Sequence, residues 1–412
     1  MSELEDTKEF EEVLHGVEPK DKGMMYKSNI WKSYLFHLFM GFHLISGILI
    51  PLFLTWGKLT FVEVMFLQGY FTIMILVFEI PCGAIADYLN RKLCLFLGGL
   101  STAFAVLVYS SMPNIFIFVL GETLWAFGEA LISGTNSAFM YDTLRKMGKE
   151  EEMSKIMAKN QSYFLVGIGL SAPLGSLLTL FLPLPLIMRL MFLPFIGASL
   201  ISITLKEPNQ DLERKIERYL TTIKSGFKEL KQNKILRILA FDLVIIEAFV
   251  FFIIWTYQLY LEDLRVPIVF FGFVAASMTL MQIIVANLIP KYEKDIYNKR
   301  RFLIIYTLIP GIGFILLSLI IFTPISIIIL LIIVGVGFSR NIIFINGIYK
   351  QIETENRATV LSTINMMACV IRAIIYPIIG LLVMWNLNYT FIILGIIIII
   401  FALLTQVKNE YL

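Results

Sequence analysis

Long runs of apolar residues alternate with short polar segments along the whole chain. A helix that crosses a lipid bilayer needs about 20 predominantly apolar residues. Twelve runs of roughly this length cover residues 32–56, 60–83, 93–111, 114–137, 161–181, 184–205, 236–260, 267–289, 302–322, 325–347, 358–383 and 388–406. The runs are apolar on every face, whereas membrane β-strands would alternate with a period of two. The pattern therefore predicts an all-α integral membrane protein with twelve transmembrane helices.

The distribution of basic residues predicts the orientation in the membrane. Cytoplasmic segments of membrane proteins are enriched in Lys and Arg. When the N-terminus is placed inside, nearly all basic residues fall in inner segments. The exceptions are Arg189, Arg340 and Arg372, which lie away from the inner edges of the runs, and Lys58 and Arg265 in outer segments. We therefore expect a multi-pass protein of the cell (plasma) membrane with both termini in the cytoplasm.

A polar segment in the middle of the chain divides the twelve runs into two groups of six. Within it, apolar residues recur at helical spacing and basic residues fill the other face, which predicts an amphipathic helix along the inner leaflet. This helix is interpreted as a tether or as a regulatory or partner site. The expected organisation is 1–31 as an N-terminal cytoplasmic segment, 32–205 and 236–406 as six-helix bundles, 206–235 as the cytoplasmic linker and 407–412 as a cytoplasmic tail.

Composition agrees with a membrane environment and argues against several function classes. The 412 residues are 58% hydrophobic and only 16% charged, whereas soluble domains carry about 25% charge. A net charge of +3 gives no basis for nucleic-acid binding. The three cysteines form no CxxC pair, and no metal-binding spacing is present, so we expect neither a metal nor another cofactor. The sequence also has no Walker A motif and no recognisable nucleophile–base constellation, which argues against an ATP-driven pump and against an enzyme.

The polar stretch GAIADYLNRK (83–92) lies between the second and third runs on the inner side. Gly83 allows two helices to approach closely, the Asp87 carboxylate suits a helix N-terminus, and Arg91 begins the third run. This stretch resembles the signature G-x-L-A-D-r-x-G-r-k of the major facilitator superfamily. Tyr88 and Asn90 depart from that signature, at the positions of a cation and a glycine.

Other segments extend the resemblance over nearly the whole chain. FEIPCG (78–83) and SGTNSAFMYDTLR (133–145) resemble the multidrug-efflux-like branch of the superfamily. ENRATVLSTIN (355–365) resembles the superfamily's loop into span eleven. The resemblance implies two pseudo-symmetric six-helix bundles that work by alternating access. It also implies that Asp87 caps the start of span eleven near Arg357 and that Arg91 pairs with Asp142. The two interpretations are a latch between the bundles and a simple topology anchor made of basic residues.

Charged residues within the membrane runs are the candidate transport residues, because each costs several kcal/mol unless it is paired or faces water. Glu122 and Glu129 are seven residues apart on one face of span four. They are interpreted as a proton- or cation-binding pair, or as hydrogen-bonded acids packed between helices. Glu247 in span seven is interpreted as a transport residue or as a structural acid. Arg372 in span eleven is interpreted as a charge that balances an acid or binds an anionic group, or as part of a structural salt bridge.

Three further polar residues in the runs have simpler expectations. His37 and His43 are six residues apart in span one and do not share a face. Each is interpreted as a hydrogen-bonded packing residue or as part of a proton relay. Arg340 is expected to snorkel from span ten to the inner surface.

These observations predict a secondary active transporter that works by alternating access. The expected activity is proton-coupled efflux of a small hydrophobic compound or drug. The alternative is uptake of a small metabolite such as a sugar or an organic anion, with Arg372 as a binding charge. The expected partners are the small-molecule substrate, H+ as the coupling ion and the lipid bilayer, and the protein is expected to be a monomer.

Overall fold

The computed structural model describes residues 20–88, 90–208, 217–293, 298–352 and 357–412, and within these residues it is helical and contains no strand. The first half contains α2 (Lys20–Met40), α3 (Leu49–Pro51), a π-helical turn η1 (Leu52–Trp56), α4 (Phe61–Tyr88), α5 (Arg91–Tyr109), α6 (Ile115–Met147), η2 (Glu150–Glu152), α7 (Met153–Leu178), α8 (Leu184–Leu190) and α9 (Phe192–Ile203).

The second half begins with the linker helix. Its elements are α10 (Glu217–Gln232), α11 (Lys234–Phe251), α12 (Ile253–Asp263), η3 (Ile268–Phe270), α13 (Phe271–Glu293), α14 (Lys299–Leu319), α15 (Thr323–Ser339), α16 (Asn341–Lys350), α17 (Arg357–Trp385), α18 (Leu387–Leu403) and η5 (Asn409–Tyr411).

Most predicted membrane spans correspond to one helix or to a pair of consecutive helices, and two spans differ from this. Among the described residues, ten helices or pairs of consecutive helices are long and apolar enough to cross a bilayer. The twelfth expected span is α18, which is apolar but has only 17 residues. The first expected span is divided into α2, α3 and η1 by a non-helical stretch at residues 41–48. The expectation of one continuous helix over 32–56 is therefore wrong, although the segment still runs through the bundle.

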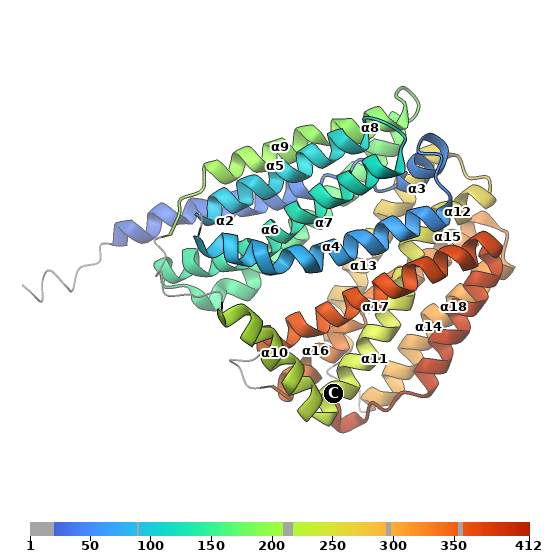
Figure 1. The fold of residues 1–412 in the computed structure, drawn as a ribbon. Coiled ribbons are helices and arrows are strands. Elements are labelled where there is room, and N and C mark those ends of the chain that lie inside the picture. Colours follow the sequence, from blue (N-terminus) through green and yellow to red (C-terminus); the bar gives the residue numbers. More distant parts are fainter. Residues whose placement is uncertain (1–19, 89, 209–216, 294–297, 353–356) are drawn as a thin grey trace, which may run out of the picture.

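The helices form two groups that lie side by side (Figure 1). Within the first group α5 packs on α6 and α9, and α2 packs on α7; within the second, α14 packs on α18 and α13 on α15. The groups contact each other mainly through α4 with α17 and α7 with α13. These two pairings form the interface between the halves.

A repeated backbone feature reflects the relation between the halves. Lys58 (φ 54°) and Arg265 (φ 57°) are the two non-glycine residues with positive φ in the described part of the chain. They follow the first and the seventh span respectively, and each of these spans is interrupted, at residues 41–48 and at Phe252. The end of the molecule that carries Lys58 and Arg265 is called the outer end, and the end that carries α10 is called the inner end.

Glycines bring the halves together at the outer end. An ideal Cβ atom on Gly47 would lie 2.5 Å from the Cα of Gly272, and one on Gly380 would lie 3.0 Å from the Cα of Val62. Neither position has room for a side chain. In Figure 1, α4 and α17 lie side by side toward this end and diverge toward the inner end. The structure is therefore closed on its outer side.

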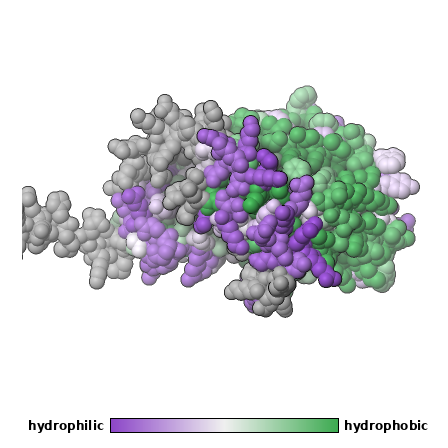
Figure 2. All heavy atoms as spheres, turned by 90° about the horizontal axis from the view of Figure 1, so that it is seen from below, coloured by the Kyte–Doolittle hydropathy of each residue, from purple (hydrophilic) through white to green (hydrophobic). Residues whose placement is uncertain are grey.

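The linker helix α10 lies across the inner end of the second half (Figure 1). Gly226 packs on α17, where an added Cβ would lie 2.2 Å from the Thr363 hydroxyl. Leu230 is buried in the core of this half, and Phe227 is exposed. Hydrophilic residues gather toward one end of the face shown in Figure 2, whereas hydrophobic residues cover the other.

Candidate transport site

A cavity of ≈ 390 Å³ lies between the halves, beneath the outer closure. This volume is in the range of small-molecule sites. The wall is mainly aromatic and aliphatic, with two carboxylates, two amides, two hydroxyls and one imidazole. It is formed by His43, Ile45, Ser46, Leu49, Phe53, Gln68, Phe71, Ile75, Tyr109, Glu122, Trp125, Glu129, Met188, Ile254, Trp255 and Gln258.

Glu122 is the more enclosed of the two α6 acids that line the cavity, with 4% of its surface exposed. Its Oε1 accepts a hydrogen bond of 2.9 Å from the Nε2 of Gln68 on α4. The Tyr109 hydroxyl at the end of α5 lies close enough to the same carboxylate for an electrostatic interaction. All three residues belong to the first half, so this group stays together if the halves move as rigid bodies.

Glu129 lies two helical turns further along α6 and lines the same cavity. Its carboxylate lies near the Trp125 indole, which also lines the cavity. Glu129 is less completely partnered than Glu122, because Glu122 accepts a hydrogen bond from Gln68. The cavity thus contains one acid held by an amide donor and one acid that faces an indole.

The two histidines of the first span differ in their surroundings. His37 has both ring nitrogens within hydrogen-bond distance of a partner: Nδ1 is 2.8 Å from the Ser33 carbonyl and Nε2 is 3.1 Å from Asn136 Nδ2. This agrees with a packing role. His43 lies in the non-helical stretch, and its buried Nε2 has no hydrogen-bond partner in the described part of the chain. Its ring makes edge contacts with Trp125 and Phe195, each at a centroid distance of 5.5 Å.

Gln258 of α12 connects the second half to the interrupted first span. Its Nε2 donates to the Ser46 carbonyl at 3.0 Å, and its Oε1 accepts from the Ile50 backbone N–H at 2.9 Å. A break in a membrane helix leaves backbone groups that need partners. Here a side chain from the opposite half satisfies two of them, so the break is stabilised only while the halves are together at the outer end.

We expect Gln258→Leu to open the outer side. The leucine side chain has a similar volume but leaves the Ser46 carbonyl and the Ile50 N–H without these partners, and each buried unsatisfied group costs about 1–3 kcal/mol. A shift of about tenfold or more toward the outward-open state follows. Labelling of Leu49→Cys by an impermeant maleimide from the outer side, in a background without the native cysteines, would measure it.

Gln68→Leu is the matched control for this experiment, because Gln68 lines the same cavity but bonds within the first half. It should leave the labelling rate of Leu49→Cys near that of the unmodified background. Equal labelling rates with and without Gln258→Leu would contradict the assignment of this residue to the outer closure.

The predicted partner of Arg91 lies beside it at the inner end of the first half. The Arg91 guanidinium forms an ion pair with Asp142 of α6 and donates to the Ala138 carbonyl. The backbone N–H groups of Arg91 and Lys92 donate to the two carboxylate oxygens of Glu207, at 2.8 and 2.9 Å. Glu207 therefore caps the N-terminus of α5, where an anion is favoured. No motif in the sequence points to this cap, because Glu207 is remote from Arg91 along the chain.

The rest of the predicted latch is only partly described. Gly83 faces Gly134, on which an added Cβ would lie 4.0 Å from the Gly83 Cα. Arg357 donates to the Tyr349 carbonyl at 3.4 Å and lies over its ring, 5.0 Å from the centroid. The side chain of Asp87 lies outside the described residues, so its contact with span eleven stays a prediction.

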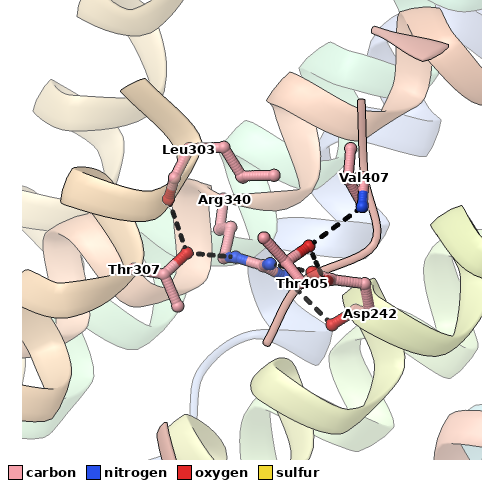
Figure 3. A network of polar contacts seen from close by, with 6 residues as sticks. All are labelled: Asp242, Leu303, Thr307, Arg340, Thr405 and Val407. Carbon is pink, nitrogen blue, oxygen red and sulfur yellow. Dashed lines mark hydrogen bonds and ion pairs between the residues drawn. The ribbon is translucent and has the colours of Figure 1, made fainter. Parts of the chain in front are cut away.

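Among the described residues, the charged residues of the second half do not line the ≈ 390 Å³ cavity. Arg372 lies over the ring of Phe251, 4.8 Å from the centroid, and is close enough to Glu247 for an electrostatic interaction. Arg340 is only 3% exposed and forms an ion pair with Asp242 (Figure 3). The expectation that Arg340 snorkels is therefore wrong, because a buried acid on α11 neutralises it within the bundle.

Comparisons with known proteins identify the family and the fold. The model of the Major Facilitator Superfamily matches residues 33–376. A crystal structure of a mutant of the nucleoside transporter NupG is similar at 15% identity, covering 90% of this chain and 97% of that one, with a TM-score of 0.77. No curated protein matches the sequence.

Two further solved structures have the same fold. A bacterial homologue of the human lysosomal transporter Spinster, inward-facing and occupied, matches at 14% identity, with 92% and 96% of the two chains covered and a TM-score of 0.71. A D-xylose–proton symporter matches at 13% identity, with 93% and 99% covered and a TM-score of 0.70. At these identities the likeness concerns the fold alone.

Proposed function

The chain belongs to the Major Facilitator Superfamily, and we propose that it is a proton-coupled exporter of small hydrophobic compounds that works by alternating access. It is a membrane transporter with the twelve-span fold of this family and not an enzyme. Export, proton coupling and the multidrug-efflux-like branch belong to the proposal. We further propose that it acts as a monomer in the cell membrane with both termini in the cytoplasm.

The apolar cavity that contains two carboxylates is the observation that carries this proposal. Phe53, Phe71 and Trp255 form much of its wall, together with aliphatic side chains. The amides of Gln68 and Gln258 are already engaged in hydrogen bonds with the protein. A hydrophobic compound would gain from burial in such a wall, because buried apolar surface contributes about 25 cal/mol per Å².

The same wall gives less support to the alternative of metabolite uptake. A sugar needs many hydrogen-bonding groups, and here the amides are occupied, although His43 Nε2, the Ser46 hydroxyl and the Trp255 N–H have no partner among the described residues. An organic anion needs a cation, but no Lys or Arg among the described residues lines this cavity, and Arg372 lies elsewhere in the second half. The lining therefore favours a neutral or cationic compound with a large apolar surface.

The two acids supply the proposed coupling. A charged carboxylate within an apolar cavity has a high free energy unless it is paired with a cation or in contact with water. When the cavity changes sides, Glu122 and Glu129 would exchange protons with the newly open side. A proton and a cationic or bulky compound would then compete for the same cavity, which links their movements.

Proton flux in proteoliposomes tests the proposal directly. A pH-sensitive dye in the lumen would report proton movement while lipophilic cations, neutral drugs, sugars and organic anions are offered in turn. We expect proton movement with the lipophilic compounds and none with the sugars. Movement that only a sugar or an organic anion elicits would replace this proposal with metabolite uptake. Substrate accumulation without any proton movement would remove the two acids from the coupling role.

A further inference from the structure

A second hollow lies on the surface of the second half, away from the transport cavity. Its volume is ≈ 450 Å³, and it is lined by Arg237, Ile238, Phe241, Asp242, Ile246, Phe401, Leu404, Thr405 and Gln406. These residues come from α11 and from the end of α18 with the segment that follows it, two elements that pack on each other. We call this hollow the α11–α18 groove.

The side walls of the groove are apolar and open to the surroundings. Phe241 is 50% exposed and Leu404 is 72% exposed, and Phe401 and Ile246 lie between the same two elements. Large apolar side chains with such exposure on a transmembrane helix contact lipid chains rather than water. The walls therefore suit a hydrocarbon chain.

The floor of the groove carries no net charge. Asp242 lies there, but Arg340 pairs with its carboxylate, and the Thr405 hydroxyl donates to its second oxygen. The acid is thus neutralised from within the bundle and does not repel an anion at the groove. The remaining charged group of the lining is Arg237.

Arg237 gives the groove a cationic end on the inner side. Its Nη1 donates to the Lys231 carbonyl at the end of α10, at 3.1 Å. This contact orients the guanidinium and leaves further N–H groups available. In the described ranges no carboxylate forms an ion pair with Arg237. Lys231 and Lys234 lie shortly before Arg237 in the sequence, so the surroundings of Arg237 are basic.

We propose that the α11–α18 groove binds an anionic phospholipid of the inner leaflet. The phosphate would accept hydrogen bonds from the Arg237 guanidinium, whose planar fork matches phosphate geometry. An acyl chain would run along Phe241, Phe401 and Leu404. Charge complementarity at one end and an apolar wall open to the bilayer at the other select a lipid over a soluble anion.

Native mass spectrometry of the full chain, released from nanodiscs of equal phosphatidylglycerol and phosphatidylcholine, tests this site. We expect the unmodified protein to retain phosphatidylglycerol in preference. Arg237→Gln should reduce the retained phosphatidylglycerol about fivefold, the effect of one basic contact at the membrane surface. Leu404→Trp, which fills the groove without changing the charge, should reduce it as well.

Arg300→Gln is the matched control, because Arg300 is an exposed arginine at the inner end of α14 that does not line the groove. Equal losses with Arg237→Gln and Arg300→Gln would overturn the site and leave only a general attraction of anionic lipid to a basic surface. Retention that Leu404→Trp does not alter would overturn the acyl-chain part. Free glycerol phosphate that displaces the lipid would show a soluble anion site instead. None of these readouts depends on transport.

Discussion

Replacing Glu122 with glutamine is expected to lower substrate-driven proton movement about tenfold or more while the protein remains folded. Glutamine has the same shape, and its carbonyl can still accept the hydrogen bond from Gln68 and face the Tyr109 hydroxyl, as Glu122 does in the structure. It cannot take up or release a proton. Linked binding of two ligands usually changes affinities about 5–150-fold, so loss of this link should lower the coupled flux about tenfold or more.

The measurement is proton flux in proteoliposomes together with substrate exchange at equal concentrations on both sides. Exchange needs no net proton movement and should persist in Glu122→Gln. Glu129→Gln runs beside it, because Glu129 shares the cavity but lacks the Gln68 and Tyr109 contacts. Normal proton flux in Glu122→Gln, with loss in Glu129→Gln, would transfer the coupling role to Glu129. Loss of both flux and exchange would indicate damage to the cavity instead.

The membrane spans follow from the sequence because bilayer thickness fixes the length of an apolar helix. The break at residues 41–48 does not follow from the hydropathy of this segment. This stretch is as apolar as its neighbours, and the partners of its backbone groups come from Gln258, which lies in the other half. A pattern read along one segment contains no information on a side chain that arrives from so far along the chain.

The candidate site, too, could be predicted from the sequence only in part. Seven-residue spacing is sufficient to place Glu122 and Glu129 on one side of a helix, and both line the cavity. The contacts of Glu122 depend on how α4 and α5 are rotated against α6, which the hydropathy of twelve uniformly apolar runs does not specify. The burial of Arg340 does not follow from the sequence for the same reason, because its acid lies on another helix.

Removing the Arg340 side chain is expected to cause the largest loss of stability in the second half. Arg340 pairs with Asp242, and its Nε donates to the Thr307 hydroxyl at 2.8 Å. Thr405 donates to the same acid and accepts from the Val407 backbone N–H at 3.2 Å, so the network of Figure 3 joins α11, α14, the α15–α16 junction and the segment after α18. Arg340→Ala would leave Asp242 buried without its counter-charge.

Breaking one partner of a buried ion pair costs about 3–5 kcal/mol, whereas apolar replacement of both partners is often neutral. Unfolding in detergent should therefore show a large loss for Arg340→Ala and a much smaller one for Arg340→Leu combined with Asp242→Leu. Arg189→Ala is the control, because Arg189 is exposed and bonds only Ser110 among the described residues. If the double variant were as unstable as the single one, the loss would arise from packing around Arg340 and not from an uncompensated charge.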